Sequence, residues 1–137
     1  MWINTWPKRP PKGGTTNIRD RELPISDAAI AIEDSGNVWL GASKGVSKYD
    51  GFSWTTYTTD DGLVDNNVTA IATDDSGNVW IGTNGGGVSE YDGSSWTTYT
   101  TDDGLASNWV NSIAIAPDGV LWFGTFRGVS RFDGNTW

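Results

Sequence analysis

The sequence predicts an all-β protein made of repeated four-stranded units, and three observations lead to this fold class. First, the 137 residues include nine tryptophans and eighteen glycines, and Thr, Asp, Ser and Val dominate the rest, which is the composition of strands and tight turns. Second, one segment of about forty residues recurs along the chain. Third, no stretch has a 3.6-residue apolar period long enough for a helix. At this length we expect one domain.

The repeat is close enough to define its period. The hexapeptide DSGNVW returns in the looser form DGVLW, and the undecapeptide SWTTYTTDDGL recurs without change. The tryptophans of the first motif are 41 and then 42 residues apart. These motifs stand at Asp34–Trp39, Asp75–Trp80, Asp118–Trp122, Ser53–Leu63 and Ser95–Leu105. Tandem repetition at this spacing predicts equivalent structural units that pack against one another.

Each unit divides into four short strands separated by glycine-containing turns. In the middle copy we expect strands at residues 68–73, 78–83, 87–91 and 95–100, joined by Asp-Ser-Gly-Asn, Asn-Gly-Gly and Asp-Gly-Ser. Four antiparallel strands per 41–42 residues, in tandem, match the size of a propeller blade. The sequence therefore predicts a β-propeller with three four-stranded antiparallel blades per chain.

Recurring small and aromatic side chains fit this architecture. Alanine-rich first strands, such as residues 28–32, suit innermost strands that converge on a narrow axis. The tryptophan of the second strand recurs in every copy, and we expect it to pack as a wedge between neighbouring blades. A tryptophan also recurs at the start of the fourth strand. The two sets are Trp39, Trp80 and Trp122, and Trp54, Trp96 and Trp137.

The repeats do not cover the whole chain. We expect a basic, proline-rich N-terminal arm at residues 1–14 and three propeller repeats within residues 15–137. The last unit stops at the tryptophan that begins its fourth strand, whereas residues 15–23 align without gaps on Thr55–Leu63. That segment therefore offers a fourth-strand sequence for a third blade. The repeats fall at about residues 24–63, 64–105 and 106–137.

The middle repeat resembles the two-component regulator propeller repeat. The likeness is carried by Asn67–Thr83 and Gly86–Gly93, and the same pattern returns at Leu121–Thr125 and Gly128–Asp133. It extends over nearly everything from residue 23 onward. In that family such repeats build extracytoplasmic sensory propellers, often joined to histidine kinases that respond to carbohydrates. The resemblance thus implies a sensory propeller in an extracytoplasmic (periplasmic or secreted) location.

Three blades do not close a ring, because closed propellers have roughly 4–8 blades and an open one leaves two sheet edges unpaired. We expect the N-terminal segment of one molecule to complete the third blade of another, so that a homodimer closes into a six-bladed ring. The expected closure residues are Trp2, Ile3, Trp6 and Trp137, and either Trp6 or Trp137 could fill the recurring tryptophan position. The alternative is a fragment of a larger propeller.

The residue types in the chain exclude several kinds of chemistry. Without Cys or His there is no disulfide, zinc or haem site, thiol nucleophile or Ser-His-Asp triad, and we expect no cofactor and no catalytic residues. The stretch Trp122–Thr125 resembles streptogramin lyase propellers, but those depend on histidine. No apolar run approaches the roughly 20 residues that span a bilayer, and the N-terminus has no signal-peptide pattern. We therefore expect no membrane contact.

Acidic pairs recur at Asp60–Asp61, Asp74–Asp75 and Asp102–Asp103 and allow two interpretations. Calcium coordination uses several carboxylates, but the spacing matches no EF-hand loop. Each pair adjoins a glycine-containing turn, where Asp side chains accept hydrogen bonds from backbone N–H groups. We favour the turn interpretation and predict no metal site. A carboxylate-based hydrolase or lyase is the less favoured, enzymatic alternative.

The formal net charge of −8 is unevenly distributed. Residues 1–21 carry five basic residues and one acidic residue, whereas the remainder carries four basic and sixteen acidic residues. A basic arm can contact nucleic acid, but this one lacks interleaved aromatic residues, and the acidic body would repel phosphates. We expect the arm to lie along an acidic face of its own chain or of a second copy, with no nucleic-acid partner.

Positions at which the repeats differ are the better guides to function, because structure alone explains the repeated ones. They occur between second and third strands and before first strands, and in a propeller both kinds of loop lie on one face. The candidate ligand contacts there are Lys44, Asn84, Trp109, Phe126 and Arg127. Aromatic surfaces beside polar groups suit a carbohydrate or a peptide. Equally, Trp109 and Phe126 could fill a seam between subunits.

The sequence as a whole predicts a non-enzymatic β-propeller module that self-assembles and binds a ligand or partner on its loop face. Two alternatives stay open: a purely structural half-propeller, and a fragment of a larger sensor propeller. The three interpretations differ in what they expect of the chain in solution, namely a ligand response, self-association alone, or neither.

Overall fold

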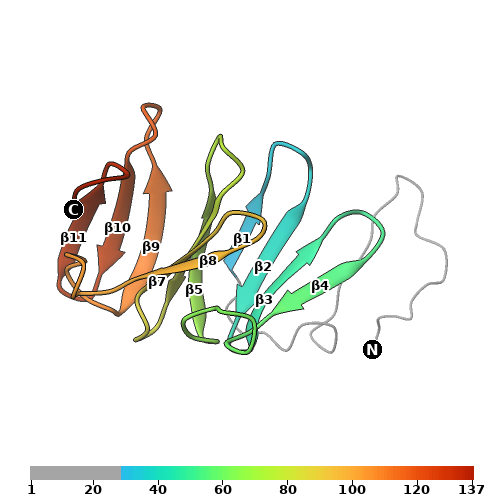
Figure 1. The fold of residues 1–137 in the computed structure, drawn as a ribbon, viewed down its shortest axis with the longest axis horizontal. Coiled ribbons are helices and arrows are strands. Elements are labelled where there is room, and N and C mark those ends of the chain that lie inside the picture. The colour runs from blue at the N-terminus through green and yellow to red at the C-terminus, as the bar shows by residue number, and fades with distance from the viewer. Residues whose placement is uncertain (1–28) are drawn as a thin grey trace.

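The computed structural model describes residues 29–137, which form three antiparallel sheets side by side (Figure 1). Each sheet follows chain order, β1 to β4, β5 to β8 and β9 to β11. Within these residues no helix is long and apolar enough to cross a membrane. The strands are β1 (Ala29–Ile32), β2 (Val38–Ala42), β3 (Gly45–Tyr49), β4 (Trp54–Tyr57), β5 (Val68–Thr73), β6 (Val79–Thr83), β7 (Val88–Tyr91), β8 (Trp96–Tyr99), β9 (Val110–Ile115), β10 (Leu121–Thr125) and β11 (Gly128–Phe132). The predicted all-β, propeller-type architecture is confirmed.

Turn residues set the ends of the strands. In the second sheet every observed strand boundary lies within one residue of the predicted one. Between β5 and β6, Gly77 has φ +86°, and Asp74 accepts hydrogen bonds from the backbone N–H groups of Ser76 and Asn78 (3.0 and 2.9 Å). The glycine supplies the left-handed conformation and the carboxylate satisfies the donors that the reversal exposes.

The third sheet has three strands, β9 to β11, among the described residues. Trp137 nevertheless packs as its equivalents do: its ring stacks on Phe132 at 4.4 Å between centroids, and Trp96 lies 4.5 Å from Tyr91 in the second sheet. Trp137 thus occupies the recurring tryptophan position of the third blade. The arm at 1–14, the segment 15–23 and the predicted closure residues Trp2, Ile3 and Trp6 lie outside the described residues.

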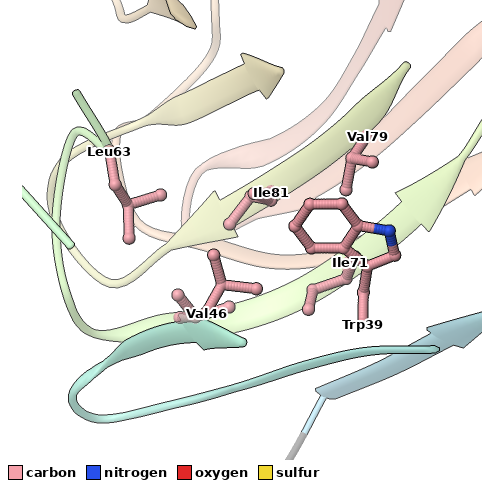
Figure 2. Packing of buried hydrophobic residues seen from close by; sticks show 7 residues of the cluster. Trp39, Val46, Leu63, Ile71, Val79 and Ile81 are labelled. Atoms are coloured by element: carbon pink, nitrogen blue, oxygen red, sulfur yellow. The ribbon is translucent and has the colours of Figure 1, made fainter. Parts of the chain in front are cut away.

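Neighbouring sheets pack face to face through two equivalent apolar clusters. Between the first two sheets, Trp39 and Val46 meet Ile71, Val79 and Ile81 of the second sheet (Figure 2). The second cluster repeats this arrangement between the second and third sheets; its buried members are Trp80, Val88, Leu105, Val110, Leu121, Phe123 and Phe132. Because each sheet buries one face against the next, a blade alone has too little core to be stable.

A glycine in the second strand lets the inner strand of the next blade approach closely. A Cβ atom at Gly41 would lie 2.4 Å from Val68 Cγ1, and one at Gly82 would lie 2.7 Å from Val110 Cγ1. Both distances are far below van der Waals contact, so alanine does not fit without movement. The first strands β1, β5 and β9 accordingly lie next to one another, as expected for the innermost strands of a propeller.

The recurring tryptophan of the second strand is buried where another sheet follows it. Trp39 and Trp80 are 1% and 4% exposed, and they stack on Tyr57 and Tyr99 of their own fourth strands. Trp122 is 42% exposed, because no sheet in the described part of the chain packs against that face of the third sheet. Wedge packing between blades is therefore confirmed for the first two tryptophans and wrong for Trp122 within one chain.

A carboxylate anchors each buried indole from the turn that precedes its strand. Trp80 Nε1–H donates to Asp74 Oδ2 (3.0 Å), and Trp39 Nε1–H donates to Glu33 Oε2. A buried indole N–H needs such an acceptor, because leaving it unpaired costs about 1–3 kcal/mol. The third repeat has Ala116 at the position of the acid, so this acceptor is missing there.

Candidate functional site

The turns between second and third strands lie beside the linkers that lead into the next blade. Gly45 N–H donates to Asn66 O (2.7 Å), and Gly87 N–H donates to Asn108 O (2.9 Å). Turns and linkers therefore form one surface, which we call the loop face: residues 43–44, 66–67, 84–86, 108–109 and 126–127. The predicted placement of the variable positions on one face follows from these backbone hydrogen bonds.

Two exposed aromatic side chains stand together on the loop face. Trp109 is 52% exposed and Phe126 is 76% exposed. Phe126 N–H donates to Trp109 O (2.9 Å), so the turn after β10 holds Phe126 alongside the residue that precedes β9. The two residues line a recess of about 330 Å³ whose surface is almost entirely apolar. The two aromatic side chains thus form a small apolar patch on the loop face.

The glycine turn of the second blade forms the other side of this aromatic pair. Asn84 makes an isolated β-bridge with Trp109, and Gly85 N–H donates to Asn108 O (3.1 Å). A Cβ at Gly85 would lie 3.6 Å from the indole of Trp109, and Gly85 has φ +110°. That distance is an ordinary van der Waals contact, so it is the left-handed backbone of the turn, and not the space beside the indole, that favours glycine here. The aromatic pair spans the junction between the second and third blades.

Ser107, which the sequence comparison did not single out, positions Trp109. Trp109 N–H donates to Ser107 Oγ (3.1 Å), and Ser107 is buried. One blade earlier the same cap is made by a carboxylate, where Asn67 N–H donates to Asp65 Oδ1 (2.8 Å). The sequence signal that could have identified Ser107 is a short polar side chain two residues before the variable position, here Trp109. Because the copies use different side chains, serine and aspartate, comparing their letters does not reveal it.

The two predicted cations lie at different places on the loop face. Arg127 directly follows Phe126, is exposed, and its N–H donates to Thr125 Oγ1 (3.1 Å). Lys44 is exposed in the turn between β2 and β3 of the first blade and is not among the described residues that line the recess. The structure therefore groups Asn84, Trp109, Phe126 and Arg127 at one junction and places Lys44 in another blade.

The acidic pairs make turn hydrogen bonds. Asp61 Oδ2 accepts from Thr58 N–H (2.9 Å), and Asp103 Oδ2 accepts from Thr100 N–H (2.8 Å). Asp74 holds the turn and the indole described above. Among residues 29–137 no group of three or more acidic side chains is placed to hold a metal ion. The carboxylates examined at the turns are thus engaged in holding the backbone.

The pKa of Glu33 reflects its anchoring role in the same way. Burial by itself raises this pKa, but hydrogen bonds from Trp39, Ser35 and Asn37 and the charge of Lys48 outweigh burial and hold it below its usual value. A lowered carboxyl pKa keeps the group ionised at neutral pH. Glu33 therefore acts as a permanent acceptor for the buried indole, which is a structural task and not acid–base chemistry.

Comparison with protein families and solved structures agrees with the geometry. The family model of the two component regulator propeller matches residues 62–85 and 104–127. Each matched segment runs from the linker through the first two strands to the turn beyond, which includes the loop-face residues Asn84, Trp109 and Phe126. No curated protein sequence matches the chain.

Extracellular domains of two component systems are among the similar solved structures. An extracellular domain assigned to the hybrid two component system BT3049 from B. thetaiotaomicron has 30% identity and a TM-score of 0.70, covering 79% of this chain and 16% of that one. The domain assigned to BT4673 from the same organism has 21% identity and a TM-score of 0.68, covering 95% and 17%. The chain thus spans about a sixth of the length of these domains.

A lyase shares the fold at a lower level of similarity. Virginiamycin B lyase from Staphylococcus aureus has 19% identity and a TM-score of 0.54, covering 80% of this chain and 42% of the lyase. That likeness extends to the fold alone. The two family-model matches, the blade geometry and the likeness to the BT3049 domain agree with one another, and two segments of this chain are accordingly two component regulator propeller repeats.

Proposed function

We propose that this chain is a non-enzymatic propeller module that binds a carbohydrate or peptide ligand on its loop face. The observation that carries the proposal is the aromatic recess formed by Trp109 and Phe126. Its volume of about 330 Å³ lies at the lower end of the range for small-ligand sites, which is roughly 300–1,000 Å³. It fits one sugar ring or one apolar side chain.

The chemistry around the recess supports recognition. The aromatic surfaces of Trp109 and Phe126 offer apolar contact, and Asn84 and Arg127 beside them offer an amide and five guanidinium N–H donors. A few polar groups around an apolar recess fix orientation and provide specificity. The same aromatic pair would also suit a seam between subunits, and in that case Trp109→Ala would lower the self-association of the chain.

The proposal of a non-enzymatic role rests on the titratable groups near the recess. General acid–base catalysis needs a group whose pKa is tuned near the working pH. The sequence has neither histidine nor cysteine, and the acids at the turns serve as acceptors for backbone N–H groups. The extracellular sensor domains that the chain resembles support an extracytoplasmic location for this module.

The test is a binding screen read by calorimetry. Arrays of neutral oligosaccharides and of short peptides are applied to the chain, and hits are measured again on Trp109→Ala, Phe126→Ala and Phe52→Ala. Phe52 is exposed in a turn away from the loop face and serves as the control. We expect a hit whose Kd rises at least ~10-fold in the two loop-face variants and not in the control. No hit in either array, or hits insensitive to both loop-face variants, would overturn the proposal.

A further inference from the structure

The two joints inside the chain are built from the same positions of the repeat. Each joint is the contact between two neighbouring sheets. One sheet contributes a tryptophan of its second strand and a valine of its third strand, and we call this the donor side of the joint. The pairs are Trp39 with Val46 in one joint and Trp80 with Val88 in the other. All four side chains are buried. The facing sheet is the receiving side. It contributes an isoleucine of its first strand, two apolar residues of its second strand and the tryptophan at the fourth-strand position. These are Ile71, Val79, Ile81 and Trp96 in the first joint, and Ile113, Leu121, Phe123 and Trp137 in the second.

The outer face of the third sheet carries the donor half of such a joint. By register, Trp122 and Val129 stand where Trp80 and Val88 stand one blade earlier. Trp122 is substantially exposed and Val129 is 68% exposed. We call this surface the trailing face (Trp122 and Val129). These two large apolar side chains are exposed to solvent because no further sheet in the described part of the chain packs against this face.

The outer face of the first sheet carries the receiving half. Ile30 occupies the register position of Ile71, and Trp54 that of Trp96. Ile30, Ile32 and Trp54 are exposed, whereas Leu40, at the register position of Ile81, is buried. We call this surface the leading face (Ile30, Ile32 and Trp54). The trailing face thus carries the tryptophan and valine of such a joint, and the leading face carries the isoleucine and tryptophan that receive them.

We infer that the trailing face binds the leading face of a second copy of this chain, as a third joint of the same kind. This inference is independent of the proposed ligand site. The joint is heterologous, because it pairs two different surfaces, and such contacts form closed rings when the rotation fits. The three described sheets of two copies would make six blades, within the roughly 4–8 blades of closed propellers. The occupant that these two faces fit is a second copy of this chain.

The experiment measures the mass of the full chain by sedimentation velocity across a concentration series. We expect twice the mass of one chain at high concentration and dissociation on dilution, with folded monomers shown by unchanged far-ultraviolet circular dichroism. Val129→Lys and Ile30→Lys each place a charge in both joints and are expected to weaken the dimer at least ~100-fold. Because both side chains are exposed within the chain, the variants keep the monomer fold.

Two controls make the result specific. Phe52→Lys changes a fully exposed phenylalanine outside both faces and should leave the dimer intact. In a mixture of the two variants, the Ile30→Lys chain supplies an unaltered trailing face and the Val129→Lys chain supplies an unaltered leading face. One of the two joints is then unaltered, so the mixture should form weak heterodimers. A wild-type chain that stays monomeric up to millimolar concentration overturns the inference, as does a dimer that survives both lysine variants.

The same series separates this inference from the ligand proposal. Trp109→Ala is expected to leave the dimer mass unchanged, because Trp109 belongs to neither end face. A monomeric Trp109→Ala chain would instead place the second copy on the loop face and overturn the end-face joint. Ligand binding that disappears in Trp109→Ala but persists in Val129→Lys supports both ideas independently.

Discussion

Trp80 and Trp122 hold the same position in neighbouring repeats, yet Trp80 is a core residue and Trp122 is a surface residue. Trp80 lies between two sheets, stacks on Tyr99 at 5.6 Å and donates its N–H to Asp74. Trp122 is ten times more exposed, and its repeat has Ala116 in place of the acid. One side chain at one place in the fold therefore has two different environments.

This difference shows which parts of the repeat belong together. The acid is present where the indole is covered within the chain and absent where it is not, which agrees with the cost of burying an unpaired N–H. At an exposed indole, water satisfies the donor. A joint made by Trp122 with a second copy would lack the carboxylate anchor, so we expect it to be weaker than the internal joints by about 1–2 kcal/mol.

Replacing the two tryptophans with alanine should give the largest contrast. Trp80→Ala removes a buried aromatic side chain from between two sheets and should lower the free energy of unfolding by about 3–5 kcal/mol. Trp122→Ala should lower it by less than ~1 kcal/mol when measured on dilute, monomeric chains. Urea unfolding followed by circular dichroism measures both. Equal losses would show that the two positions have the same environment, contrary to the structure.

Removing the acid that anchors the indole should have an intermediate effect. Asp74→Ala leaves the indole N–H of Trp80 and two turn N–H groups without their acceptor, and we expect a loss of about 1–3 kcal/mol. The matched control is Asp118→Ala in the third repeat, where the carboxylate accepts only from Val120 N–H (3.0 Å). Its expected loss is below ~1 kcal/mol. A control that costs as much as Asp74→Ala would assign the effect to the turn alone.

Alkaline pH should weaken the two buried tryptophan stacks, with the smallest effect of the three. Burial, with hydrogen bonds to Tyr91 and Glu90 respectively, raises the pKa of Tyr57 and of Tyr99 from 10.0 to about 12. The folded state therefore favours the neutral tyrosines, and their contribution to stability is complete below pH 10 and lost as the pH rises towards 12. Melting temperatures should fall across that window. The Tyr57→Phe/Tyr99→Phe double variant should show a smaller fall, and an equal fall would contradict this assignment.

The fold could be predicted from the sequence because its determinants are local and repeated. Turn aspartates and glycines fix the strand ends of the second sheet, so the strands were placed within one residue. The register of the second-strand tryptophans followed from the same repeat. The exposure of Trp122 was missed, because burial of a blade face depends on the neighbouring blade and not on the repeat that carries it.

The structure brings some of the residues predicted for the candidate site together and keeps others apart. Differences between repeats pointed to Asn84, Trp109 and Phe126, which the structure brings together at the junction of two blades. The same criterion selected Lys44, which lies in the first blade, and overlooked Ser107, which holds Trp109 by its backbone N–H. A difference between copies indicates that the repeated structure does not require one particular residue at that position. It carries no information on which blades contact each other.

The sequence by itself determined the repeated unit, its four-strand order and its turns, because these depend on residues near one another along the chain. Tertiary structure alone decided which of the equivalent side chains became core and which became surface. Trp39 and Trp80 are covered by the next sheet, whereas Trp122 and Val129 face outward with nothing beyond them among residues 29–137. The physical reason is that apolar burial requires a partner surface, and only the arrangement of the sheets supplies or withholds it.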